Sequence, residues 1–331
     1  MNSILPRQTR ALTTRRSSAR QALPWLAALA LFASGACTAQ SAASDSHAQI
    51  SLDVGIGHES QTSPLFQISP ESTILYIGGL QRLRGSHVRT SLQGATDWSL
   101  GDGLSVSLAG DVTVKRSPQT PDLDFMSLSV QPALHQLVGD SSIGVGLNLQ
   151  RIDVAGAHFR DSHGLQLSWT RPDGKNLWSL LADYGVNRHK GDLDTLDGSS
   201  ASIVLQRQIA EALPGIDSID LTAILGRERN TRGFRELSDR NALLSAQVQW
   251  SGLGATWTVG RSWRRARFDE TVFPTEPPRQ DRTSMLDLAA EWPLTGSISL
   301  RIEVNDVRNE STTRLYENHY QQIAAALRTS L

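Results

Sequence analysis

Two short stretches of this sequence contain residue types that could catalyse a reaction. His158 and His163 flank Asp161, and Ser141 follows Asp140. The histidine spacing matches no zinc-ligand pattern, and a serine in a glycine-containing turn lacks the G-x-S-x-G motif of a nucleophile. No glycine-rich phosphate loop occurs either. We therefore interpret these residues as solvated loop and turn residues, and we expect no enzymatic activity, no metal and no cofactor.

Charged residues that alternate with apolar ones are the stronger functional candidates. Side chains on a strand point alternately to opposite faces, so these charges share the face opposite the apolar one. Both signs occur, and a charge in a narrow interior is costly unless it is paired or hydrated. Two interpretations stay open: a salt-bridged interior that is effectively plugged, or a hydrated passage whose charges select the solute. The lumen-facing candidates are Asp111, Lys115, Asp183, Asp220, Arg264, Asp287, Glu291, Arg301, Glu303 and Arg328.

The segments that carry these residues have a hydrophobic period of two. Near the C-terminus, for example, Leu300 and Ile302 alternate with Arg301 and Glu303. The same alternation recurs from Gln49 onward, whereas no segment of comparable strength has the period of an amphipathic helix. The sequence therefore predicts an all-β chain whose strands each have one apolar face and one polar face.

The connections between these segments alternate between short and long. Most of the short ones contain the Gly, Asp or Pro that tight turns favour. Outer-membrane barrels have this arrangement, because their short turns lie at one rim and their long loops at the other. The predicted fold is therefore a transmembrane antiparallel up-and-down β-barrel. The short connections are 99–103, 138–142, 171–175, 210–217, 251–252 and 293–296, and the long ones are 116–123, 155–163, 188–199, 229–240, 265–280 and 309–318.

The number of strands agrees with such a barrel. From Val88 to Leu331 the pattern gives 13 strands, and one more must precede them. It is either 49–57, with 58–85 as a long outer loop, or 73–79. Both choices give about 14 strands, an even number that places both ends of the barrel at the periplasmic rim. Five tryptophans fall near that rim, where an indole ring can be half apolar and half hydrated; they are Trp98, Trp169, Trp178, Trp250 and Trp292.

The N-terminal residues have the features of an export signal. An arginine-bearing segment precedes an apolar run at 22–33, and small residues then permit cleavage near Ala48 or Ala39. We predict a signal peptide at 1–48 and the barrel at 49–331. Cys37, the only cysteine, either leaves with the signal or becomes the lipidated residue of a lipoprotein. Without the five arginines and one aspartate of 1–48, the net charge changes from -1 to about -5, which argues against nucleic-acid binding.

Short motifs in the C-terminal region resemble a known family. The stretch 279–282 (Arg-Gln-Asp-Arg) opens a strand that ends at Trp292, and 308–311 (Arg-Asn-Glu-Ser) is followed by 315–317 (Leu-Tyr-Glu). With His58-Glu59-Ser60 near the first outer loop, these motifs resemble the C-terminal barrel domain of surface lipoprotein assembly modifiers. The resemblance covers 49–331 and implies a 14-stranded outer-membrane barrel that exports lipoproteins. It departs from the family at Thr312, at the non-aromatic Leu331 and in lacking the periplasmic helical-repeat domain.

These patterns together predict a bacterial outer-membrane β-barrel protein with periplasmic N- and C-termini. Its expected role is that of a non-catalytic channel, or of an export or assembly component for a surface or secreted passenger. Its expected partners are outer-membrane lipid, lipopolysaccharide and a lipoprotein or secreted passenger, with no nucleic acid. Arginines of the long loops could hold lipopolysaccharide phosphates or an anionic passenger, or form a solvated rim; they are Arg229, Arg232, Arg235, Arg240, Arg265, Arg267, Arg279 and Arg282.

Two alternative functions remain open from the sequence. A barrel-type lipid-modifying enzyme requires a Ser/His pair or carboxylates that converge near one rim. A soluble periplasmic β-rich binding protein requires a second layer that covers the apolar face. The membrane barrel instead requires one outward apolar band that includes Leu104, Val145, Leu180, Leu221 and Leu300.

Overall fold

The computed structural model describes most of the chain after the N-terminal segment. The described residues are 47–61, 66–67, 73–74, 83–119, 121, 124–190, 196–231, 238–270, 277–313 and 316–330. The predicted signal peptide up to residue 46, including Cys37, lies outside them, as do Arg232, Arg235 and Leu331. The first described strand begins at His47, two residues before the predicted start of the barrel.

The described part of the chain is built almost entirely of strands, because its apolar and polar residues alternate. The strands are β1 (His47–Gln61), β2 (Phe66–Gln67), β3 (Thr73–Ile74), β4 (Leu83–Gly101), β5 (Leu104–Arg116), β6 (Phe125–Val138), β7 (Ser141–Val154), β8 (Ala157–Asp173), β9 (Asn176–His189), β10 (Gly198–Leu213), β11 (Ile216–Asn230), β12 (Asp239–Gly252), β13 (Ala255–Phe268), β14 (Gln280–Pro293), β15 (Ile298–Ser311) and β16 (Asn318–Ser330). None of the described residues forms a helix that is long and apolar enough to cross a membrane.

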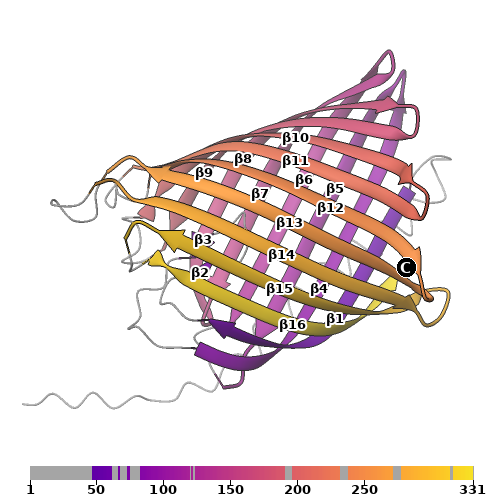
Figure 1. The fold of residues 1–331 in the computed structure, drawn as a ribbon. Helices are drawn as coiled ribbons and strands as arrows, with labels where there is room; N and C mark the ends of the chain where they lie inside the picture. Colours follow the sequence, from indigo (N-terminus) through magenta and orange to yellow (C-terminus); the bar gives the residue numbers. More distant parts are fainter. Residues whose placement is uncertain are drawn as a thin grey trace, which may run out of the picture. The chain divides into compact units, whose positions relative to one another are not determined.

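Fourteen of the described strands close into an antiparallel barrel, as predicted (Figure 1). From β4 to β16 each strand pairs with its neighbours in the chain, and β1 pairs with both β4 and β16. The barrel strand that precedes β4 is therefore the predicted 49–57 segment. Within the alternative segment 73–79, the described residues Thr73 and Ile74 form β3, which pairs with β2 in a separate two-stranded sheet. Closure leaves the barrel without an unpaired sheet edge.

With one exception, the turn 155–156, short and long connections lie at opposite rims of the barrel, as the sequence predicts. The short-turn rim has the connections 102–103, 139–140, 174–175, 214–215, 253–254 and 294–297. Longer connections at the other rim, hereafter the long-loop rim, are 62–82, 117–124, 190–197, 231–238, 269–279 and 312–317.

One predicted long loop is wrong. The predicted loop 155–163 is a two-residue turn at Ala155 and Gly156, followed by strand β8. Both turn residues have positive φ (50° and 77°), the conformation of the tight hairpin turns that match strand twist. His158 and Asp161 therefore lie on a strand and contact each other (Nε2 to Oδ1, 2.9 Å), and the interpretation of His158 and His163 as loop residues is wrong. Ser141 likewise begins β7 and lies outside the turn 139–140.

The apolar side chains of the strands point away from the barrel interior. Val145, Leu180 and Leu221 are 43%, 41% and 42% exposed, whereas fully buried apolar residues are few in the described part. Leu104 and Leu300 share this face and are half-buried. No second layer of described residues covers the face. A small apolar cluster of Ile152, Phe159, Phe125 and Val154 lies near the long-loop rim.

Tryptophans mark the short-turn rim. Trp250 stacks on Trp257 with 6.3 Å between ring centroids, and Trp257 meets Trp292 edge-on at 5.8 Å. The Trp257 indole donates a hydrogen bond of 2.9 Å to the carbonyl of Gly252 in the adjacent turn. Trp250 and Trp292 were expected here, and Trp257 extends the group. An indole with an apolar body and one satisfied polar atom suits the boundary between lipid and water.

Candidate functional site in the barrel interior

The polar residues of the strands face the barrel interior. Each alternates with outward apolar residues, and Leu221, Leu288, Ile302 and Leu327 of that outward set are all exposed. Because they alternate with these outward residues, all ten lumen-facing candidates lie on the inward face. Their role in solute selection stays a prediction. The structure brings Asp287, Glu291, Arg301, Glu303 and Arg328 together on β14–β16 and places the others around the wall.

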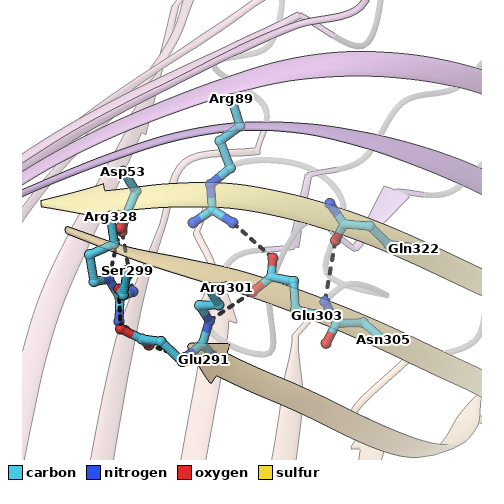
Figure 2. A network of polar contacts seen from close by, with 9 residues as sticks. All are labelled: Asp53, Arg89, Glu291, Ser299, Arg301, Glu303, Asn305, Gln322 and Arg328. Atoms are coloured by element: carbon cyan, nitrogen blue, oxygen red, sulfur yellow. Dashed lines mark hydrogen bonds and ion pairs between the residues drawn. The ribbon is translucent and has the colours of Figure 1, made fainter. Parts of the chain in front are cut away.

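Four of the grouped charges form an ion-pair network on the inner wall (Figure 2): Glu291, Arg301, Glu303 and Arg328. Arg301 contacts Glu291 and Glu303 on β14 and its own strand β15, each at 3.5 Å. Arg328 of β16 donates to Glu291 at 3.1 Å and to both carboxylate oxygens of Asp53 at 2.8 and 3.3 Å. Asp53 lies on β1, so the network crosses the junction between the first and last barrel strands, hereafter the closure seam (β15, β16, β1 and β4).

One contact of this network spans four strands. Arg89 on β4 lies 3.7 Å from Glu303 on β15, with β16 and β1 between them. The intervening register positions are small: Gly55 lies beside Arg89, and Ala324 lies beside Glu303. Long side chains can therefore lie along the wall and meet, as the concave face of a curved sheet favours. A Cβ on Gly55 would lie 2.8 Å from the Cβ of Ala326, so the strands approach closely here.

A second polar layer lies along the same seam toward the long-loop rim. Glu59 is buried, and Lys115 Nζ lies 2.6 Å from its Oε1, while the Tyr320 hydroxyl donates to its Oε2 at 3.2 Å. His87, which is also buried, lies 4.0 Å from Glu59 and 3.2 Å from the Gln322 amide. Lys115 was a sequence candidate and Glu59 was not. Glu59 lies an even number of residues from Asp53 on the same strand and therefore shares its inward face. This alternation could have identified Glu59 from the sequence.

The remaining candidates make separate local contacts. Asp183 accepts hydrogen bonds from Gln166 at 3.2 Å and Ser202 at 3.5 Å. Arg264 donates to Asp239 at 3.1 Å. Asp111 accepts a hydrogen bond from Ser129, and Asp220 accepts one from Ser218. These residues line the interior without joining the network at the seam.

A polar cavity of about 450 Å³ adjoins the network. Its position against β12–β16 makes it part of the barrel interior near the short-turn rim. Three carboxylates and two guanidinium groups line it, together with hydroxyl and amide side chains. The polar lining residues are Gln247, Gln249, Thr256, Thr258, Asp287, Glu291, Arg301, Glu303, Asn305 and Arg328.

A different cluster fixes the long-loop rim. The Arg279 guanidinium lies between the rings of Phe268 (3.4 Å to the centroid) and Tyr316 (3.6 Å), and Nε lies 3.4 Å from Asp281 Oδ1. Burial lowers the pKa of Arg279, and the nearby Asp281 carboxylate opposes that shift. Asn309 donates to the Tyr316 carbonyl at 2.7 Å. Arg279 belongs to the loop arginines for which the sequence left binding of an anion or a solvated rim open, and it is buried. The motif residues of the family resemblance thus meet in one clamp between two loops.

The Ser107–His135 contact on the inward face lacks one member of a catalytic triad. Ser107 Oγ and His135 Nε2 lie 3.0 Å apart on the inward face. No carboxylate among the described residues contacts the other nitrogen of His135, so the third group that orients a general base in a triad is missing there. The described residues also contain no group of three His, Cys, Asp or Glu side chains that could hold a metal ion.

Comparisons with known proteins leave the family open. No protein-family model matches the chain, and no curated protein matches it significantly. Among solved structures, the chain is similar to the TodX monoaromatic hydrocarbon channel (TM-score 0.48, 11% identity, covering 86% of this chain and 90% of that one). It is also similar to Pseudomonas aeruginosa OccK2 in complex with glucuronate (TM-score 0.43, 10% identity, 86% and 98%). The Vibrio cholerae outer membrane protein OmpT with loop L8 deleted gives TM-score 0.43 and 8% identity, covering 86% and 99%. Likeness at this level assigns no function to this chain.

Proposed function

We propose that this chain is an outer-membrane β-barrel that forms a hydrated, charge-lined passage for small polar solutes. One observation carries the proposal: a closed barrel exposes an apolar band outward and turns inward the polar positions that alternate with that band. In water, the exposed band would leave each large apolar side chain without roughly 1.5–3 kcal/mol of burial free energy. In a bilayer the band is in contact with acyl chains, and closure satisfies the backbone hydrogen bonds that lipid cannot.

The inner wall supports a hydrated passage over a dry plug. Side chains of Glu291, Arg301 and Glu303 are 25%, 29% and 24% exposed even though they form ion pairs. A dry plug would bury such charges fully, at a desolvation cost of several kcal/mol for each ion. Charges of both signs beside a polar cavity favour small polar solutes over apolar ones.

The proposed orientation follows from the two rims. The N-terminal end of β1 and the C-terminal end of β16 lie at the short-turn rim, with the tryptophans. In bacterial barrels short turns are periplasmic and long loops are extracellular. We therefore assign the short-turn rim to the periplasm.

A matched pair of neighbouring substitutions tests which face contacts lipid. On β11, Leu221 points outward, whereas the adjacent Thr222 points inward. We expect Leu221→Arg to lower the free energy of unfolding by roughly 2–4 kcal/mol in a bilayer, and Thr222→Arg to change it by less than about 1 kcal/mol. The assay is urea unfolding of liposome-inserted protein, with the outer-membrane fraction and heat-dependent gel mobility as checks of folding. Equal effects of the two substitutions, or recovery of the wild-type chain as a soluble periplasmic protein, would refute the membrane barrel.

Conductance in a planar bilayer tests the passage separately. The purified chain should give ion-conducting events with a defined selectivity. An inserted and folded barrel without conductance would show that the interior is plugged.

A further inference from the structure

The outward face of β13–β15 changes from apolar to cationic toward the long-loop rim. Arg261, Arg265, Arg282 and Arg308 are exposed and have the same outward parity as the apolar band. They border a groove of about 740 Å³ whose lining also includes Leu244, Trp263 and Leu286. Trp263 is 52% exposed, and Leu244 is 60% exposed. The groove therefore has a cationic end and an apolar wall. It lies on the outward surface, which contacts lipid in the proposed function.

The cations of this groove outnumber its two carboxylates, Asp306 and Glu310. Glu310 is the register partner of Arg282 across β14–β15. Arg265 and Arg282 are direct cross-strand partners in the β13–β14 register, an arrangement of like charges that is destabilising. Within the described part of the chain, Arg265 contacts the Gln280 amide at 3.3 Å and Arg282 forms no ion pair. Arg308 lies 3.2 Å from Asp306, but that carboxylate also contacts His319 at 2.6 Å. An anion between Arg265 and Arg282 would remove this repulsion.

The chemistry of the groove indicates what such an anion is. Guanidinium groups bind phosphate through paired N–H donors, so adjacent arginines suit a phosphorylated group. A free phosphate would use the arginines alone and would make no contact with Leu244, Trp263 and Leu286. A lipid uses both parts, because its phosphate meets the arginines and its acyl chains lie along the apolar wall. Trp263 beside Arg261, with 5.6 Å from the guanidinium to the ring, suits the headgroup level of a membrane.

We propose that Arg265 and Arg282, supported by Arg261 and Arg308, bind the phosphate groups of an outer-leaflet glycolipid of the lipopolysaccharide type. This inference rests on the proposed function, because the long-loop rim must face the outer leaflet. It adds a specific lipid site to that function. It also gives these exposed arginines a role in binding, whereas the buried Arg279 has a structural role. It also assigns the groove to lipid and leaves the passenger, if one exists, to other surfaces.

Lipid binding to the full-length protein in detergent tests the site. The probe is bisphosphorylated lipid A, its dissociation constant is measured by native mass spectrometry, and the test variant is Arg265→Gln/Arg282→Gln. The matched control is Arg171→Gln, because Arg171 is exposed with outward parity on β8 but lies at the short-turn rim. We expect binding to weaken about tenfold or more in the double variant, as for the loss of one or more charge-assisted hydrogen bonds, and to be unchanged in the control.

Further measurements distinguish a glycolipid from other sources of phosphate. They also distinguish failure of the lipid site from failure of the barrel proposal. Dephosphorylated lipid A should bind at least about tenfold more weakly than the bisphosphorylated form. Equal binding by phosphatidylglycerol, or competition by inorganic phosphate at equal concentration, would overturn the assignment to a glycolipid. Unchanged lipid A binding by the double variant would overturn the site, while heat-dependent mobility and outer-membrane recovery of the same protein would leave the barrel proposal intact. A wild-type chain absent from the membrane would overturn both.

Discussion

The ion pair between Asp53 and Arg328 should stabilise the closed barrel measurably. These residues are direct partners in the β1–β16 register, and the guanidinium donates to both carboxylate oxygens. A charge-assisted pair contributes roughly 1.5–3 kcal/mol when buried. The Asp53 side chain is 20% exposed and the Arg328 side chain is 32% exposed. Discounting for solvent screening, we expect a coupling free energy of about 1–2 kcal/mol.

A double-mutant cycle measures this coupling. The variants are Asp53→Asn, Arg328→Gln and the double substitution, and the readout is the free energy of unfolding in urea from phospholipid micelles. The control cycle uses Lys175 and Glu211, which form an ion pair at the short-turn rim with side chains 68% and 69% exposed. That pair should couple by less than about 0.5 kcal/mol. If the seam pair couples no more strongly than the exposed pair, the argument that the charges hold the seam is wrong.

Three further predictions concern packing, selectivity and the loop clamp. Gly57→Ala should destabilise the barrel by about 1–3 kcal/mol in the same urea assay, because its Cβ would lie 2.6 Å from the His87 ring, whereas Gly94→Ala, with no atom nearer than 3.8 Å, should be nearly neutral. Glu303→Gln should shift the reversal potential in a salt gradient toward anion selectivity, since it removes a carboxylate from the cavity wall; an unchanged potential would place the ion path elsewhere. Arg279→Ala should lower the free energy of unfolding by roughly 3 kcal/mol because it removes the ion-pair partner of the half-buried Asp281 and leaves that carboxylate with the Ser311 hydrogen bond. The exposed Arg282→Ala should cost under about 0.5 kcal/mol, and equal costs would contradict the clamp.

The strands and their faces could be predicted because both are encoded locally. Alternation at positions such as Leu300 and Arg301 needs only the two-residue period of a strand, and turn chemistry marks where strands end. The error at 155–163 arose where this signal fades. The strand beyond Gly156 has polar residues on both faces, among them His158 and Asp161, and Phe159 alone interrupts a composition that is typical of a loop.

The contacts between charges were not predictable in the same way. The sequence placed Arg301, Glu303 and Arg328 on one face, but their partners Arg89 and Asp53 lie on the first two barrel strands. Such pairs depend on closure of the barrel and on the register of the seam, and neither follows from local periodicity. The buried Arg279 escaped prediction for a related reason, since a loop arginine becomes buried only when two loops meet.

The closure seam also has a consequence for how the barrel assembles. From β4 to β16 every strand pair joins neighbours in the chain, so hairpins can add to the sheet one after another with short loop closures, and β1 joins β4 across the connection 62–82. Only β1 and β16 must find each other across nearly the whole described chain, as Asp53 and Arg328 do. That final pairing has the largest loop-closure entropy of any step. The seam is also where long polar side chains cross several strands over small residues. The interactions that line the proposed passage can therefore also bias the last strand toward the correct partner and register.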